Sequence, residues 1–160
     1  MSGDREVTLR PVSDADEDFL FAVYASTRAE EMARVPWNEE QKTGFVRMQY
    51  TAQARHYSVE FPAGRHEIVC ADGRPAGRLY TDRNDERLLI LDITILPEFR
   101  NAKVGETVLR QLMREAESAA TPVTIWVESF NPSQRFFARL GFERTKEQGF
   151  NQLLCWSPKR

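Results

Sequence analysis

The chain of 160 residues is poor in the residues that build metal sites and disulfide frameworks. It has two cysteines, Cys70 and Cys155, and two histidines, His56 and His66, without metal-ligand spacing. We therefore expect neither a disulfide framework nor a metal site. Both cysteines lie in apolar runs typical of strands, so we expect buried free thiols, which suit a reducing cytoplasm.

Long apolar runs and a large excess of one charge are also missing. No apolar run approaches the roughly 20 residues that a membrane span needs, and residues 1–6 are polar, unlike a signal peptide. Lysine and arginine number 22 against 24 aspartate and glutamate, which gives a formal net charge of -2. General nucleic-acid binding needs a clustered basic surface. We therefore expect a cytoplasmic protein that binds neither membranes nor nucleic acid.

Hydrophobic periodicity and turn signals predict a single mixed-sheet α/β domain over residues 1–160. The predicted order is strand, helix, helix, strand, strand, strand, helix, strand, helix, strand, strand. The most apolar strand, Leu88 to Leu96, is expected to be central and covered on both faces. A helix beginning at Asn38 is expected to pack through Phe45, Met48 and Ala52.

The segment from Ile93 to Gly105 joins this apolar strand to a long helix. Such a loop directs backbone N–H groups and the positive end of the helix dipole at one spot, which suits a phosphate. Gly105 removes a Cβ where a ligand would approach, and Lys103 adds a positive charge. An ordinary strand–helix connection explains these residues equally well.

Two motifs resemble those of the GNAT family of N-acetyltransferases. The family pattern (Gln/Arg)-x-x-Gly-x-(Gly/Ala), after a strand ending in Val-x-Pro, is similar to Ile95-Leu96-Pro97 followed by Arg100 and Gly105, with Lys103 at the middle glycine position. The segment from Asn131 to Phe142 resembles the family's Asn-Pro-Ala…Phe-Tyr-x-x-Leu-Gly-Phe signature. The second match is the more specific, because it fixes a helix cap, an aromatic pair and a helix terminator together. The resemblance spans nearly the whole chain.

The resemblance implies a GNAT-like fold with acetyl-coenzyme A (acetyl-CoA) bound between two splayed strands that end near Ile95 and Val127. The backbone of Ile93 and Ile95 would pair with the pantetheine arm, and Asn131 would reach the same region. The N–H groups of residues 101–106 would hold the pyrophosphate. The residues expected at the cofactor besides those already named are Arg100, Asn101, Ala102, Lys103, Val104, Gly105, Glu106 and Phe137.

The reaction implied by the resemblance is direct attack of an amine on the thioester, which needs a base for the amine and an acid for the thiolate. Asp92 and Glu128 are the expected catalytic residues. A structural carboxylate bonded to arginine or backbone is the alternative for Asp92, and a solvated strand end is the alternative for Glu128. Phe137 stands where the family often has the tyrosine that protonates the thiolate, and phenylalanine has no proton to donate.

The implied acceptor is a primary amine of a small molecule or peptide. The acidic residues Glu30 and Glu31 could attract it and Trp37 could stack on it, although a solvated helix with one packing tryptophan is the simpler interpretation. Two other functions stay open: a degenerate acyl-CoA-binding module without efficient turnover, and a structural or assembly protein with no cofactor. An exposed apolar edge strand at 153–156 would favour the latter or a homodimer.

Overall fold

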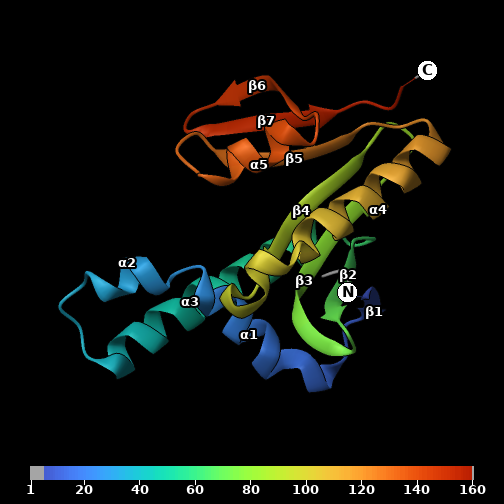
Figure 1. The fold of residues 1–160 in the computed structure, drawn as a ribbon. Helices are drawn as coiled ribbons and strands as arrows, with labels where there is room; N and C mark the ends of the chain where they lie inside the picture. The colour runs from blue at the N-terminus through green and yellow to red at the C-terminus, as the bar shows by residue number, and fades with distance from the viewer. Residues whose placement is uncertain (1–5, 160) are drawn as a thin grey trace. The chain divides into compact units, whose positions relative to one another are not determined.

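The computed structural model describes residues 6–159, except for the side chains of Asn101 and Ala102. Seven strands form a mixed sheet with the hydrogen-bonded order β1-β2-β3-β4-β5-β7-β6 (Figure 1). The predicted α/β class and order of elements are confirmed. The elements are β1 Val7–Pro11, η1 Asp14–Asp16, α1 Glu17–Ser26, α2 Ala29–Ala33, α3 Glu39–Glu60, β2 Arg65–Ala71, β3 Arg74–Arg83, β4 Leu88–Ile95, η2 Pro97–Ala102, α4 Val104–Ala119, β5 Val123–Glu128, α5 Ser133–Arg139, β6 Glu143–Gln148 and β7 Asn151–Trp156.

The chain divides into two compact units. The first contains the residues up to Tyr80 together with Asp92–Gly105, and the second contains Thr81–Leu91 together with the residues from Glu106 onward. Strands β3 and β4 and helix α4 therefore contribute to both. Among the described residues, none of the helices combines the length and the apolar character that crossing a membrane requires.

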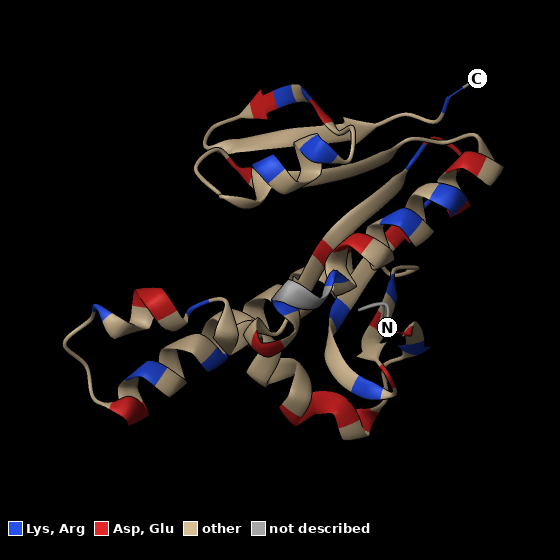
Figure 2. Ribbon diagram, in the orientation of Figure 1, with Lys and Arg blue, Asp and Glu red and all other residues tan. Residues whose placement is uncertain are grey.

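In the first unit, β1 and β2 form an antiparallel ladder from Val7↔Ala71 to Pro11↔Glu67. Arg10 on β1 holds the carboxylate of Asp16 through two nitrogen–oxygen contacts of 2.8 and 2.9 Å. Hydrogen bonds from Arg10 and from the Ser13 backbone keep the pKa of Asp16 well below its usual range. Figure 2 shows the acidic residues at the start of α1, where negative charge suits the helix dipole.

Helix α3 begins as predicted but buries a different face. Asn38 accepts a hydrogen bond from the Gln41 backbone at 2.8 Å, and the Gln41 side chain accepts one from the Asn38 backbone at 3.0 Å. The predicted apolar face was wrong at Met48, which is 60% exposed, and at Ala52, which is exposed, whereas Phe45 is half-buried and packs against the core. Spacing by four residues places Val46 and Tyr50 inward instead. They join a core that contains Leu20, Tyr24, Met32, Ile68 and Cys70.

In the second unit, β4 and β5 pair in parallel from Leu88↔Val123 to Ile90↔Ile125. On its other side β5 pairs antiparallel with β7 over its whole length, from Val123↔Trp156 to Glu128↔Asn151. Figure 1 shows α5 alongside β5 and β7. Gly141 ends α5 with φ +99°, and the Phe142 N–H donates to the Phe137 carbonyl at 3.1 Å, the pattern of a Schellman cap.

Three predictions about exposure need correction. Strand β7, which contains residues 153–156, is not an edge, because β6 covers it; β6 is the edge, and its six residues are all exposed. Cys70 is buried, but Cys155 is only half-buried. Strand β4 is central, yet only Leu88 to Ile90 are buried, and the residues from Leu91 to Ile95 are half-exposed. The periodicity of an apolar run does not tell how much of the strand its neighbours cover.

Candidate functional site

The loop after β4 is anchored to β3 at its beginning and bonded within itself. The Leu96 N–H donates to the Ala76 carbonyl on β3 at 2.8 Å, and the Arg100 Nε donates to the Ile95 carbonyl at 3.2 Å. Phe99 is 3% exposed, and the Arg74 guanidinium lies 5.3 Å from its ring centre. Of the residues predicted here, Ile93 and Ile95 are half-buried and Arg100 is exposed. The side chains of Asn101 and Ala102 lie outside what the structure describes.

Lys103 is the turning point between this loop and α4. Its backbone is left-handed, with φ 59° and ψ 21°. A non-glycine residue pays about 1 kcal/mol or more for this conformation. The conformation supplies a physical reason for glycine at the equivalent position of the family pattern. The chain turns here into α4, so the first-turn N–H groups from Val104 onward point along the helix axis, a donor set that fits a phosphate.

Gly77 is a site residue that sequence reasoning missed. A Cβ built on Gly77 would stand 2.1 Å from the Thr94 carbonyl oxygen and 2.9 Å from the Ile95 Cα. Strand β3 therefore admits no side chain where it meets the end of β4. A glycine inside an apolar strand signals such a close approach, and this was the available clue.

Asp92 forms an ion pair with the buried Arg78 rather than presenting a lone carboxylate. The Arg78 Nε lies 2.5 Å from Asp92 Oδ2, and Thr94 donates its hydroxyl to Asp92 Oδ1 at 2.9 Å. The Nη2 atom of Arg78 donates to Gln53 Oε1 on α3 at 2.6 Å, and the Arg78 side chain is only 3% exposed. Both oxygens of Asp92 are thus engaged, which matches the structural alternative weighed for this residue.

Three ring side chains lie close enough to this ion pair to feel its charges or pack on one another. Tyr80 stacks on His66 with ring centres 4.4 Å apart and meets Tyr57 edge-on at 5.1 Å. Burial and then the Asp92 carboxylate raise the pKa of Tyr57 to about 12. Burial and then the Arg78 charge lower the pKa of His66 to about 4. Both residues are therefore neutral at pH 7.

Glu128, the other predicted catalytic residue, ends β5 in the second unit. Its side chain is exposed, and no ion pair or side-chain hydrogen bond is found for it among residues 6–159. Its carbonyl accepts from the Asn131 backbone at 3.0 Å and from the Gln134 side chain at 2.8 Å. Two carboxylates predicted for one role thus differ sharply, because Asp92 is neutralised by Arg78 and Glu128 is not.

The predicted motif at residues 131–142 has the expected local structure. Asn131 Oδ1 accepts from the Ser133 backbone at 2.9 Å and so caps α5, although the helix begins one residue later than the sequence indicated. Phe137 is 3% exposed and lies 5.5 Å from the Phe136 ring and 5.4 Å from the Phe142 ring. Its packing role is therefore evident.

Glu106, in the first turn of α4, lies 3.8 Å from Arg110.

The residues proposed for the acceptor side are mostly engaged with neighbours. Arg28 lies 3.4 Å from Glu31 and donates to the Tyr24 hydroxyl at 3.2 Å. Trp37 is 39% exposed and meets Phe45 edge-on at 5.3 Å. This arrangement is that of a packing tryptophan beside a solvated helix.

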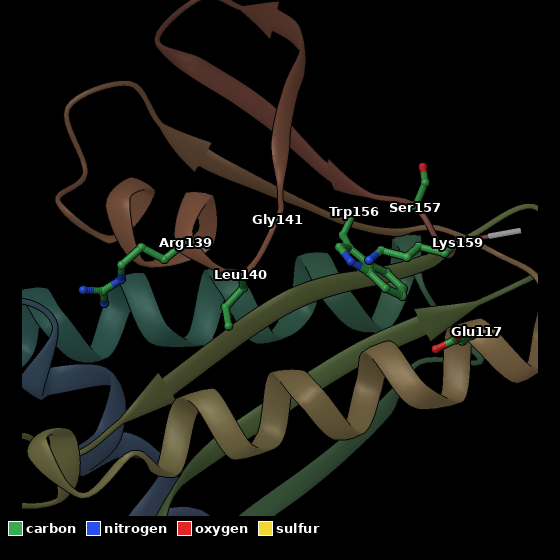
Figure 3. Close-up of a pocket in the computed structure, with 7 residues that line it drawn as sticks. All are labelled: Glu117, Arg139, Leu140, Gly141, Trp156, Ser157 and Lys159. Carbon is green, nitrogen blue, oxygen red and sulfur yellow. The ribbon is translucent and has the colours of Figure 1, made fainter.

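Two hollows on the surface contain none of the predicted site residues. One, of about 510 Å³, lies in the second unit and is lined by Glu117, Arg139, Leu140, Gly141, Trp156, Ser157 and Lys159. Figure 3 shows that Arg139 turns away from Trp156. Trp156 faces Val123 in the β5–β7 ladder, so this hollow is at the opposite end of β5 from Glu128. The other, of about 640 Å³, is lined by α3 alone.

Comparison with known proteins decides the family. A sequence model of the acetyltransferase (GNAT) family matches residues 26–142, most of the chain and parts of both units. The chain belongs to the GNAT acetyltransferase family. No curated protein matches the sequence.

Solved structures of other GNAT proteins share the fold. They include PaiA N-acetyltransferase from Thermoplasma acidophilum in complex with coenzyme A, with a TM-score of 0.70 at 16% identity over 95% of this chain and 99% of that chain. The ribosomal-protein-S18-alanine N-acetyltransferase from Escherichia coli has a TM-score of 0.66 at 12% identity over 97% and 96%. Ard1 from Thermoplasma volcanium has a TM-score of 0.65 at 13% identity over 96% of this chain and 99% of that chain. At such identities the likeness shows the fold alone. GNAT proteins use acetyl-CoA as the acyl donor.

Proposed function

We propose that this protein is an N-acetyltransferase that transfers the acetyl group of acetyl-CoA to a primary amine, with residues 1–160 acting as one catalytic domain. The observation that carries the proposal is the parallel ladder of β4 and β5, which runs from Leu88↔Val123 to Ile90↔Ile125. Strand β5 continues beyond this ladder to Glu128 and pairs with β7 over its whole length. We propose that this last part of β5 borders the pantetheine arm.

The donor would be held by backbone groups and few side chains. The pyrophosphate would lie on the N–H groups from Asn101 to Glu106, where the left-handed Lys103 directs the chain into α4. The backbone of Ile93 and Ile95, two half-buried residues, would pair with the pantetheine arm. When bound, acetyl-CoA supplies the thioester; the protein has to orient it and to move two protons.

Glu128 is the better of the two proposed bases. An amine that enters as an ammonium ion must lose a proton before it can attack. The carboxylate of Asp92 already neutralises the buried guanidinium of Arg78, and protonating it would leave that charge uncompensated. Glu128 has no such partner among the described residues and is open to solvent, so it can accept a proton and release it.

Thiol release from acetyl-CoA in the presence of a panel of primary amines tests the proposal. We expect turnover with some amine, and a fall in kcat/KM of about 100-fold or more in Glu128→Gln, while coenzyme A still raises the melting temperature of the variant. Glu147→Gln is the matched control, because Glu147 is also exposed on the sheet of the second unit, where it pairs with Arg144 at 3.0 Å and accepts from the Gln152 side chain at 3.5 Å. No thiol release with any amine would count against the enzyme.

A second candidate function, binding of acyl-CoA without efficient turnover, is favoured by Phe137. A buried phenylalanine provides no proton for the departing thiolate. Under this alternative, coenzyme A and acetyl-CoA stabilise the protein but no amine gives turnover, and Phe137→Tyr creates measurable thiol release. A wild-type protein that turns over at least as fast as Phe137→Tyr excludes the alternative.

A further inference from the structure

Strand β5 in the second unit buries the side chains of one face and leaves the end of its other face open. Along β5, Val123, Ile125 and Val127 are buried, whereas Trp126 and Glu128 are exposed. Because side chains alternate along a strand, Trp126 and Glu128 share the open face. Trp126 is 40% exposed, a large apolar area to leave uncovered by the rest of the chain.

Cross-strand partners define the neighbours of these two side chains. Trp126 faces Leu153 on β7, which faces Lys146 on the edge strand β6. Glu128 faces Asn151, which faces Gln148. The cross-strand neighbours of Glu128 are therefore the uncharged amides Asn151 and Gln148. The cation Lys146 belongs to the other set of neighbours, two strands from Trp126. The Glu128 carboxylate thus has no opposite charge among its direct cross-strand neighbours.

The backbone beside Glu128 is firmly held. The Ser129 N–H and hydroxyl both donate to the Phe150 carbonyl, at 2.7 and 2.9 Å. The Gln134 side chain donates to the carbonyls of both Glu128 and Ser129, at 2.8 and 2.6 Å. Phe130 and Phe150 adjoin these hydrogen-bonded residues in the sequence and are 74% and 78% exposed. Aromatic side chains on a fixed backbone bind at a low cost in entropy.

We propose that Trp126 and Glu128 select the acceptor, and that the acceptor is a small molecule whose primary ammonium group is joined to an aromatic or other apolar body. This inference rests on the proposed function. The carboxylate of Glu128 attracts the ammonium, and the face of an indole ring attracts a cation while its area packs against an apolar body. A polar amine of the same charge gains only the first of these two contacts.

Binding is tested without catalysis by a compound that cannot be acetylated. Phenethyltrimethylammonium is titrated into the full chain saturated with coenzyme A, and the indole N–H signals of Trp37, Trp126 and Trp156 are followed by NMR. Substitution of each tryptophan by phenylalanine assigns the three signals. We expect a saturable shift of the Trp126 signal, with Kd raised about fivefold or more in Glu128→Gln and unchanged in Glu147→Gln.

Selectivity is tested by kinetics with two amines of equal charge. We expect kcat/KM for phenethylamine to exceed that for ethanolamine by about tenfold, Trp126→Ala to abolish this preference, and Trp126→Phe to retain most of it. The Val59→Ala variant, which alters a side chain 68% exposed on α3, keeps the preference. A shift confined to Trp37 or Trp156, or an equal loss for both amines in Trp126→Ala, would overturn the inference. If no amine is acetylated but Trp126 still shifts, the proposed function fails while the binding site stands.

Discussion

The guanidinium of Arg78 and the carboxylate of Asp92 form an ion pair across β3 and β4, with 2.5 Å between Nε and Oδ2. Gln53 on α3 and Thr94 on β4 complete their hydrogen bonds. A buried pair of this kind contributes little net stability, but removal of one partner leaves the other charge uncompensated. The pair thus ties α3 to the two strands.

Breaking this pair should destabilise the protein far more than replacing it. We expect Asp92→Leu to lower the free energy of unfolding by about 3–5 kcal/mol, and Arg78→Met combined with Asp92→Leu to recover most of that loss. Urea denaturation of the wild type, both single variants and the double variant measures the coupling. An Asp92→Leu variant within 0.5 kcal/mol of the wild type would show that the pair is not formed.

Lys103 should be a point of backbone strain that glycine relieves. Lys103→Ala removes the side chain but keeps a Cβ at φ 59°, whereas Lys103→Gly removes both. The difference between the two variants therefore isolates the backbone, and we expect Lys103→Gly to be the more stable by about 1 kcal/mol. Thermal denaturation measures this, and the shift caused by coenzyme A is recorded for both. Equal melting temperatures would contradict a left-handed Lys103.

Gly77 and Gly44 should respond to alanine in opposite directions. In Gly77→Ala the new Cβ meets the Thr94 carbonyl, whereas a Cβ at Gly44, inside α3, meets nothing within 4 Å. We expect Gly77→Ala to lose about 2 kcal/mol or more and to weaken the thermal shift caused by coenzyme A, and Gly44→Ala to gain up to about 1 kcal/mol. Equal stability of Gly77→Ala and wild type would mean that the two strands are further apart.

Sequence alone predicted the order of elements because strong local signals mark their limits. Helix α3 begins at the expected Asn38, which forms a capping box with Gln41, and the Asp72-Gly73 turn, with φ 51° and 80°, joins two strands that were both expected. Gly141 ends α5 for the reason inferred, since only a residue tolerant of positive φ continues the chain there. Each of these signals is satisfied by residues a few positions apart, so no knowledge of the tertiary structure is needed.

Predictions that depended on distant partners were less successful. The inner face of α3 was misjudged because Met48 and Val46 are both apolar and only packing decides between them. Strand β7 was considered as an edge because the sequence predicts the last two strands but not which of them lies at the edge of the sheet. The partner of Asp92 lies 14 residues away on another strand, so the sequence left its structural and catalytic alternatives open.

His66 should make the protein less stable in mild acid. Burial, and then the charge of Arg78, lower the pKa of His66 from its ordinary value of 6.5 to about 4. The imidazole of residue 66 therefore takes up a proton near pH 6.5 in the unfolded chain, but only near pH 4 in the folded chain. By linkage, the stability is complete above pH 6.5 and falls as the pH drops toward 4, by about 1–3 kcal/mol for a half-buried side chain.

Replacing His66 by phenylalanine isolates this effect. The ring can still stack on Tyr80, and the buried Nε2 of His66, for which no hydrogen-bond partner is found among the described residues, is removed. We expect the free energy of unfolding of His66→Phe to change less than that of the wild type between pH 6.5 and 4. The exposed His56, replaced in the same way, serves as the control and should leave the slope unchanged. Asp16 makes a separate contribution to stability. Because its pKa is lowered in the folded protein, this contribution is lost as the pH falls below the ordinary value of 3.8. Parallel curves for His66→Phe and the wild type above pH 4 would show that His66 titrates normally in the folded protein.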